Sequence, residues 1–594
     1  MARLRRSTQL LVALLCVACT RPIAAPCPPL AQAEVARTAP VLPARSLPAG
    51  PASPGTALGI HGAVSSAEQN ASTVGVDVLR RGGNAVDAAI AVAFALAVTH
   101  PTAGNIGGGG FMVIRMQSGA TTSIDYRETA PLSATRDMYL DGAGNPTHDS
   151  LVGPRAAGIP GTVAGLALAH QRFGTLPWAD LIEPAVRLAR DGHALDQAHA
   201  EDMAHAVEAM HKAGYEDSAK LYAGPDGAPM HEGELWRQPE LAHTLEEVAR
   251  HGAQAFYDGP LADLMVAGVQ TLGGLWTKED LHRYRAIERP PIVFEYRGHQ
   301  IVSMPPPSSG GIVLRQILGA SELLSMREQP WRSVAGLHLY VEAARRAYAD
   351  RNELLGDPDF VQVPTAKLTS MAYIESRMKD IDPAHATPSA SIHGGLVPAE
   401  SKETTHFSVI DEAGNAVSNT YTLNTGFGAK VAIPGTGVLL NDEMDDFAAK
   451  PGTPNVYGLV QSEANAIAPG KRMLSSMTPT IVVKDGAVRA VIGTPGGPTI
   501  INSVAQVLLA LIDHGKSLDE AVRAPRLHHQ WLPDQIVVEP SFEPELEQGL
   551  VALGHHVTRR ETMGQVECIE IDPLTHGFRA VADITRRYGA AVAY

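Results

Sequence analysis

The sequence predicts an α+β protein in which β-sheets are covered by layers of helices. Between about 160 and 290, apolar residues recur at the spacing of a helix, as Val163, Leu166 and Ala167 do. After residue 404 the pattern changes to short runs that are typical of strands. A chain of 594 residues, 45% hydrophobic and 19% charged, is long enough to bury the core of such a layered fold.

The N-terminus predicts an export signal over residues 1–26. A short apolar run from Leu10 to Ala18 follows a positive segment, and it is too short to span a bilayer. Cys19 is a candidate lipid attachment site, although Cys16 stands where such signals normally carry an apolar residue. The Pro/Ala-rich residues 27–57 predict a tether. We therefore expect a periplasmic or secreted protein, lipid-anchored if Cys19 is modified, with no transmembrane segment in the mature chain.

Charge and cysteine content exclude several classes of partner and site. The formal net charge of −15 argues against a nucleic-acid partner. The cysteines, four in all, form neither a disulfide framework nor a metal cluster, since two of them lie inside the signal. We expect no metal and no organic cofactor.

Ordered structure is expected to begin near residue 58. Two helical patterns follow, separated by Gly82-Gly83, and the second is apolar nearly all round, which predicts a helix buried between other layers. The glycine-rich stretch 104–111 is followed by a strand-like run from Met112 to Ile114 rather than by a helix. Close backbone packing therefore explains it better than a phosphate loop, which needs a helix N-terminus behind it.

The remaining elements follow in order along the chain. Helices are expected at 240–252 and 332–356, and a strand within 298–311 runs into a proline turn. The predicted strands after residue 404 are Phe407 to Ile410, Ala416 to Leu423, Gly437 to Leu440, Thr480 to Lys484 and Val488 to Ile492. Helical patterns near 500–513 and 517–523 complete the series.

A hairpin is predicted around the turn signal 411-DEAGN-415. If Ile410 lies opposite Ala416, the same antiparallel register places Thr404 opposite Thr422. On the hairpin alone, an ordinary cross-strand threonine pair is the better explanation. A threonine becomes a useful nucleophile when it begins a chain, because its own α-amine, with a pKa near ~8, serves as the base. That requires a cut between Glu403 and Thr404.

Nine short motifs resemble those of bacterial gamma-glutamyltransferases (gamma-glutamyl transpeptidases), members of the N-terminal nucleophile hydrolases. The resemblance runs from about residue 58 to 588. The motifs are 82-GGNAVDAA-89, 99-THPTAGNIGGGGFM-112, 124-IDYRETAP-131, 304-MPPPSSGG-311, 404-TTHFSV-409, 420-TYTLNTGFG-428, 440-LNDEMDDF-447, 472-RMLSSMTPT-480 and 493-GTPGG-497. The resemblance implies a four-layer αββα sandwich.

The resemblance also implies a self-cleaving precursor. Thr404 matches the nucleophile that cleavage after Glu403 exposes, giving a large subunit (58–403) and a small subunit (404–594) that form a heterodimer. Thr422 matches a supporting threonine, and Gly496 and Gly497 match the backbone donors of the oxyanion hole. The implied reaction transfers the gamma-glutamyl group of glutathione, through an ester on Thr404, to water or to an amino acid or dipeptide.

Seven further positions match substrate-binding residues of the family. Arg127 matches the clamp on the substrate α-carboxylate, although a lone arginine is more often in a surface ion pair. Asp446 matches the partner of the α-ammonium, with help from Asn424 and Glu443, where some relatives have glutamine. Without the resemblance, the acidic run 442–446 is most often a solvated loop. Ser475 and Ser476 match hydroxyl donors to the α-carboxylate, and Tyr457 matches a residue of the lid loop.

Two other functions and one departure stay open at this stage. A glutaryl-amide or cephalosporin acylase of the same superfamily would share the nucleophile but would not need an ammonium partner at Asp446. An exported amino-acid-binding protein would need the charge clamp but no cleavage. The chain ends 583-DITRRYGAAVAY-594, whereas the family tends to finish with an Asp-x-Arg signature.

Overall fold

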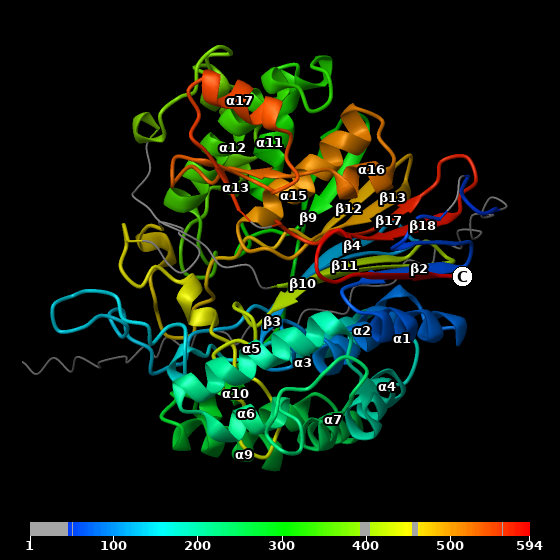
Figure 1. Cartoon of the computed structure of the whole chain (residues 1–594), viewed down its shortest axis with the longest axis vertical. Helices are drawn as coiled ribbons and strands as arrows, with labels where there is room; N and C mark the ends of the chain where they lie inside the picture. The colour runs from blue at the N-terminus through cyan, green and yellow to red at the C-terminus, as the bar shows by residue number, and fades with distance from the viewer. Residues whose placement is uncertain (1–44, 50–51, 393–403, 454–460, 561) are drawn as a thin grey trace, which may run out of the picture. The chain divides into compact units, whose positions relative to one another are not determined.

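Two β-sheets lie face to face between two layers of helices (Figure 1). The computed structural model describes residues 45–49, 52–392, 404–453, 461–560 and 562–594. These residues belong to one compact unit, Ala44–Tyr594. The four-layer αββα sandwich expected from the sequence is confirmed.

In each large sheet the described strands number seven, and every neighbouring pair is antiparallel. One sheet has the order β19(Ala590–Ala593)-β2(Gly62–Ser66)-β10(Thr405–Asp411)-β11(Ala416–Thr422)-β3(Gly109–Arg115)-β4(Thr121–Asp125)-β7(Ile287–Arg289). The other has the order β1(Thr56–Gly59)-β18(Phe578–Ala582)-β17(Glu567–Ile571)-β13(Ala487–Ile492)-β12(Thr480–Lys484)-β9(His299–Ser303)-β8(Ile292–Tyr296). Two small sheets pair β14(Leu527–His528), β15(Ile536–Val538) and β16(Val557–Arg559), and β5(His193–Ala194) with β6(Leu235–Trp236).

Three hydrophobic cores separate the four layers. The core between the sheets contains Phe111, Ile410 and Ile481. The core beneath the β10 sheet receives α1(Gln69–Arg80), α2(Ala85–Thr99), α3(Thr162–Phe173), α4(Trp178–Asp191), α7(Pro239–His251), α8(Gln254–Tyr257), α9(Pro260–Thr271) and α10(Lys278–Arg283). The core above the other sheet receives α11(Gly310–Leu323), α12(Val334–Leu354), α14(Met371–Met378), α15(Thr499–Leu508), α16(Leu518–Arg523) and α17(Pro544–Ala552). Outside these cores lie α5(Gln197–Ala213), α6(Glu216–Tyr222) and α13(Thr365–Leu368).

Most elements expected from the sequence form where the pattern places them. All of α2 is buried, and Asn84 and Asp87 form a capping box at its start. After α15 the chain continues as a π-helical turn, Leu509–Asp513. The expected strand from Gly437 to Leu440 is wrong, because only Leu439 forms a bridge, to Ala432. Pro434 and the positive φ angles of Gly435 and Gly437 bend this segment into a loop.

The glycine-rich stretch before β3 is packed against other backbone, as the sequence predicts. A Cβ on Gly107 would lie 2.0 Å from the carbonyl oxygen of Leu439, and one on Gly108 would lie 2.0 Å from that of Thr422. These contacts leave no room for a side chain. The stretch therefore fixes how closely β3 approaches the end of β11.

None of the helices in the described ranges combines the length and the hydropathy that crossing a bilayer requires. The expected signal, with Cys19, and the tether residues 27–44, 50 and 51 lie outside the described residues. The tether residues 45–49 and 52–57 are described, and Thr56 and Ala57 belong to β1, which pairs with β18.

Candidate active site

The hairpin of β10 and β11 has the register that the sequence predicts. Thr405 pairs with Tyr421, and Ile410 pairs with Ala416. Extending this register by one residue places Thr404 opposite Thr422, at the open end of the hairpin. Both threonines are buried, with 8% and 2% of their surface exposed. The hydroxyl of Thr422 accepts a hydrogen bond from the amide of Asn424 (2.9 Å), which fixes the turn that leaves β11.

A short acidic turn is attached directly to this end of the hairpin. It is the 3₁₀ turn Glu443–Asp446. The amide of Asp442 donates to the carbonyl oxygen of Leu423 (3.0 Å), and the side-chain amide of Asn424 donates to that of Asp442 (3.0 Å). Asn424 adopts a φ of 83°, a conformation that asparagine tolerates better than most residues. The acidic turn and the two threonines are therefore held in a fixed relation.

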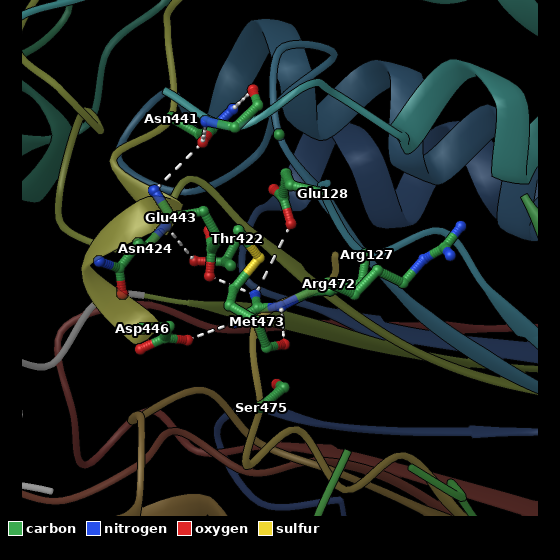
Figure 2. Close-up of polar contacts among 12 residues, drawn as sticks. Arg127, Glu128, Thr422, Asn424, Asn441, Glu443, Asp446, Arg472, Met473 and Ser475 are labelled. Atoms are coloured by element: carbon green, nitrogen blue, oxygen red, sulfur yellow. Dashed lines mark hydrogen bonds and ion pairs between the residues drawn. The ribbon is translucent and has the colours of Figure 1, made fainter. Parts of the chain in front are cut away.

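Arg127 lies two residues beyond β4 and is fully buried. Its guanidinium forms ion pairs with Glu443 and Asp446, and one of its terminal nitrogens lies 3.7 Å from Glu128 (Figure 2). The arginine side chain is oriented by the carbonyl oxygen of Met473, which accepts from its Nε at 3.3 Å. The structure therefore brings Arg127 and the acidic run together in one buried cluster.

The electrostatics of this cluster follow from burial and from one cation among three carboxyl groups. Burial alone would lower the pKa of Arg127, but Glu443 and Asp446 raise it above its ordinary value. Burial raises the pKa of Glu443 and Asp446, against the opposite effect of Arg127. Burial also raises the pKa of Glu128 to about 8. The excess of carboxyl groups over cations is what a bound ammonium group would neutralise.

Two serines complete the polar wall below Arg127, and Figure 2 shows Ser475 there. The hydroxyl oxygen of Ser475 accepts from the amide of Met477 (3.1 Å), and that of Ser476 accepts from Arg351 (3.0 Å). A hydroxyl that accepts one bond in this way retains its own O–H for donation. Both serines are therefore suited to donate to an anion.

Gly496 and Gly497 form the turn that enters the N-terminus of α15. Their φ angles are 126° and 54°, in the region that favours glycine. Neither amide donates a hydrogen bond to any residue that the structure describes. The N-terminus of a helix favours negative charge, so two such amides can stabilise an oxyanion.

Two site residues were missed by the sequence analysis. Glu128 was quoted only as part of a motif, yet neither carboxyl oxygen has a hydrogen-bond partner within the described ranges. Arg351 lies on α12 and is 1% exposed, and its charge lowers the pKa of Asp446 while burial and Arg127 act more strongly. Arginines of a long helix are ordinarily expected at the surface, so no sequence signal identified it. Glu403 and Tyr457 lie outside the described residues.

One group of side chains has the composition of a metal site. The ligand atoms of His338, Glu342 and His555 lie within 4.8 Å of one another and are buried. Their hydrogen bonds are satisfied within the protein: His555 pairs with His338 (2.8 Å), and His338 donates to the carbonyl oxygen of Asp382 (2.8 Å). Glu342 is paired with two neighbouring arginines. The group therefore acts as a polar support for α12, on which His338 and Glu342 lie.

Comparisons with known proteins agree with this geometry. The model of the family described as gamma-glutamyltranspeptidase matches residues 71–594. The glutathione hydrolase proenzyme of Escherichia coli K12 is 49% identical over 535 residues, which cover 89% of this chain and 92% of that protein. The proenzyme of the same name from Bacillus subtilis 168 is 38% identical over 554 residues, covering 90% and 92%.

Solved structures show the same architecture. A cephalosporin acylase from Bacillus halodurans superimposes with a TM-score of 0.79 at 27% identity, covering 92% of this chain and 98% of that one. A chain of the gamma-glutamyltranspeptidase of Helicobacter pylori has a TM-score of 0.55 at 43% identity, covering 59% and 97%. On the family match and these relatives, the chain belongs to the gamma-glutamyltranspeptidase family.

Proposed function

We propose that this protein is a self-cleaving enzyme that removes the gamma-glutamyl group from glutathione and related amides. The observation that carries the proposal is the buried pairing of Arg127 with Asp446 and Glu443, bonded to the end of the hairpin on which Thr404 and Thr422 lie. A glutamyl group presents a carboxylate and an ammonium on one carbon. A cation beside an excess of carboxylates is complementary to that zwitterion.

Recognition of the glutamyl group follows from exchanging these ion pairs. The substrate carboxylate takes the guanidinium fork of Arg127, and the hydroxyls of Ser475 and Ser476 donate to its remaining lone pairs. The substrate ammonium forms ion pairs with the carboxylates of Asp446 and Glu443, which no longer pair with Arg127. It also donates a hydrogen bond to the side-chain oxygen of Asn424. Because the protein charges are paired before the substrate arrives, no buried charge is left without a partner at either stage.

The chemistry begins at Thr404 after the bond from Glu403 has been cut. The α-amine of Thr404 takes the hydroxyl proton as Oγ attacks the gamma-carbonyl carbon, and the amides of Gly496 and Gly497 hold the resulting oxyanion. The amide C–N bond then breaks, and the leaving amine takes the proton. Water or an acceptor amine next attacks the ester and restores the Thr404 hydroxyl. Thr422, opposite Thr404, supports the nucleophile.

The precursor would mature into two subunits, 58–403 and 404–594, and act outside the cytoplasm. Both the periplasm and the external medium fit the signal expected over residues 1–26, with an anchor only if Cys19 is lipidated. Tyr457 would cover the bound glutamyl group and limit the entry of water.

An acylase of glutaryl-type side chains is the second candidate, favoured by the fold similarity to the cephalosporin acylase. A glutaryl group has a carboxylate but no ammonium. Its carboxylate would pair with Arg127, but it would bring no ammonium group to pair with the buried carboxylates of Asp446 and Glu443. The gamma-glutamyl substrate is therefore the better match to this cluster.

The first experiment is intact mass and N-terminal sequencing of purified protein, with Thr404→Ala beside it. The wild type is expected to yield a fragment of about 20 kDa that begins Thr-Thr-His-Phe, a mass scaled from the 62.8 kDa chain. Thr404→Ala should stay as one chain without activity. Cleavage or turnover of gamma-glutamyl-p-nitroanilide by Thr404→Ala would overturn the assignment. A faster reaction with the glutaryl anilide would favour the acylase.

A further inference from the structure

The cavity beside Thr404 is lined by a histidine that the mechanism above does not use. A cavity of about 170 Å³ is bounded by Thr404, Thr405, His100 and Tyr588, among others. His100 follows the last residue of α2, where its amide caps the helix by donating to the carbonyl oxygen of Leu96 (2.9 Å). The cavity has room for several water molecules, each of which occupies about 30 Å³ in the liquid.

His100 is the first member of a hydrogen-bonded chain that leads to the surface. Its Nδ1 lies 2.8 Å from Nε2 of His199, and Nδ1 of His199 lies 2.8 Å from a carboxylate oxygen of Asp196. Asp196 also caps α5 by accepting from the amide of His199 (2.8 Å), so the helix start holds the ring in place. The side chain of Asp196 is 58% exposed, whereas that of His199 is 3% exposed.

The protons of this chain can be assigned from what each atom is able to do. A carboxylate can only accept hydrogen bonds, so Nδ1 of His199 carries a hydrogen and donates a hydrogen bond to Asp196. Nε2 of a neutral His199 must then accept from Nδ1–H of His100. Nε2 of a neutral His100 is therefore the basic nitrogen, and it has no bond partner within the described ranges. Burial lowers the pKa of His100 well below its ordinary value, which keeps the ring neutral.

Other titratable groups around the cavity are unsuited to accept a proton. His406 uses both ring nitrogens, toward Thr420 (2.8 Å) and Ser408 (3.2 Å). Burial raises the pKa of Glu567, and both of its carboxylate oxygens already accept hydrogen bonds, from Ser65 (2.6 Å) and Gln565 (3.1 Å). Arg586 and Arg587 are permanently protonated. In the described lining, His100 is the available base.

Two buried hydroxyls of residues that line the cavity are suited to bind water. Oγ1 of Thr405 and the hydroxyl of Tyr588 are buried without a hydrogen-bond partner within the described ranges. Both residues line this cavity, and the ring of Tyr588 packs edge-on against His100 with centroids 4.7 Å apart. Buried polar atoms of this kind are ordinarily satisfied by water.

We propose that His100, positioned by His199 and Asp196, accepts the hydroxyl proton of Thr404 during self-cleavage. This inference rests on the proposed function. The α-amine that serves as the base in turnover is still part of a peptide bond in the precursor, so the first reaction of the chain needs another base. His100 and Thr404 line the same cavity, and His100 supplies that base directly or through cavity water.

The proposed step balances with one water. The proton of Thr404 Oγ moves to Nε2 of His100 as Oγ bonds to the carbonyl carbon of residue 403. The C–N bond then breaks, and His100 returns the proton to the nitrogen of Thr404, which becomes a free amine. Water hydrolyses the ester and leaves a carboxyl group on residue 403 and the hydroxyl on Thr404. His199 and Asp196 are positioning residues that orient His100, and the charge of Asp196 favours its cationic form.

The test follows the appearance of the C-terminal fragment after cell-free synthesis of the full chain. His100→Gln should cleave about 10²-fold more slowly than wild type, the usual contribution of a general base. His199→Gln and Asp196→Asn should be slower than wild type but faster than His100→Gln. His211→Gln is the matched control, because His211 forms the same kind of pair, 2.9 Å from Glu216, at the other end of α5. It should cleave at the wild-type rate.

Chemical rescue separates a base from a structural residue. His100→Ala leaves space for imidazole, and added imidazole should accelerate its cleavage at least ~10-fold, as replacement of a missing base requires. Wild-type cleavage by His100→Gln, or a slow His100→Ala that imidazole does not accelerate, would overturn the inference. If Thr404→Ala still cleaves, the proposed function itself fails. If Thr404→Ala is uncut and His100→Gln cleaves normally, only the role of His100 fails.

Discussion

Replacing Asp446 by asparagine removes one negative charge from the cluster around Arg127 and leaves the shape of the side chain nearly unchanged. The two side chains have nearly the same volume, and Arg127 keeps its ion pair with Glu443, so no buried charge loses its last partner. The unfolding free energy should therefore change little. What disappears is the charge that would face the substrate ammonium. A hydrogen bond to a charged group contributes about 1.5–3 kcal/mol, which corresponds to roughly 10- to 100-fold in kcat/KM.

The assay compares gamma-glutamyl-p-nitroanilide with the glutaryl anilide, which lacks the ammonium group. Asp446→Asn should lose the stated factor with the first substrate and be within about 3-fold of wild type with the second, the scatter expected of a neutral change. Asp445→Asn is the matched control, since this carboxylate in the same turn accepts from Ser150 (2.7 Å), whereas Arg127 pairs with Asp446 and Glu443. It should behave like wild type with both substrates.

Two results would refute the reasoning behind this prediction. Equal losses with both anilides would mean that Asp446 supports the fold of the site rather than the ammonium. An unchanged kcat/KM with the gamma-glutamyl substrate would mean that the ammonium lies elsewhere. Appearance of the C-terminal fragment on a gel, checked in parallel, ensures that only processed enzyme is compared.

Three further outcomes can be measured on single variants. Gly108→Ala should lower the unfolding free energy by about 1–3 kcal/mol or abolish folding, because its Cβ would lie 2.0 Å from the Thr422 carbonyl oxygen; thermal unfolding at wild-type Tm would contradict this. Gly496→Ala should lower kcat by about 10²-fold with fragment formation checked separately, since its φ of 126° is strained for alanine and one oxyanion donor shifts; an unchanged kcat would remove Gly496 from the oxyanion hole. Burial raises the pKa of Asp196, but the hydrogen bonds from His199 outweigh this effect and lower the pKa to about 2. The stability that this carboxylate contributes is present above its unfolded pKa of about 3.9 and is lost as the pH falls toward 2. The Tm of Asp196→Asn should therefore be below that of wild type at pH 6, with the gap narrowing below pH 4; a gap independent of pH would contradict the assignment.

Local patterns predicted the elements that local physics controls. The apolar helix α2, the turn at 411–415 and the register of β10 with β11 each follow from a few neighbouring residues. The strand expected from Gly437 to Leu440 does not form, because the chain turns back through a tight loop here and only one bridge, between Leu439 and Ala432, joins its two sides. Sequence spacing does not report that constraint.

The site was predicted unevenly for a similar reason. Arg127 and Asp446 came from motifs, and their contact joins residues more than 300 positions apart, which no spacing argument shows. The buried positions of Glu128 and Arg351, and the chain from His100 to Asp196, depend on packing between distant helices and strands. The last residues of the chain differ from the Asp-x-Arg signature of the family. Asp583 nevertheless pairs with Arg526 (2.9 Å) and Arg586 (2.8 Å), and these ion pairs anchor the turn before β19.

The order of strands within the two large sheets has a consequence for the cleaved protein. Both sheets mix strands from before and after Thr404: β2 lies between β19 and β10, and the block β18-β17-β13-β12 lies between β1 and β9. In both sheets, strands of one half of the chain are therefore hydrogen-bonded to strands of the other half. Neither half contains all the strands of a sheet. Cutting the bond before Thr404 yields two polypeptides that are interlocked rather than merely docked. They should not exchange with other copies on dilution, and they should unfold together as a single cooperative body.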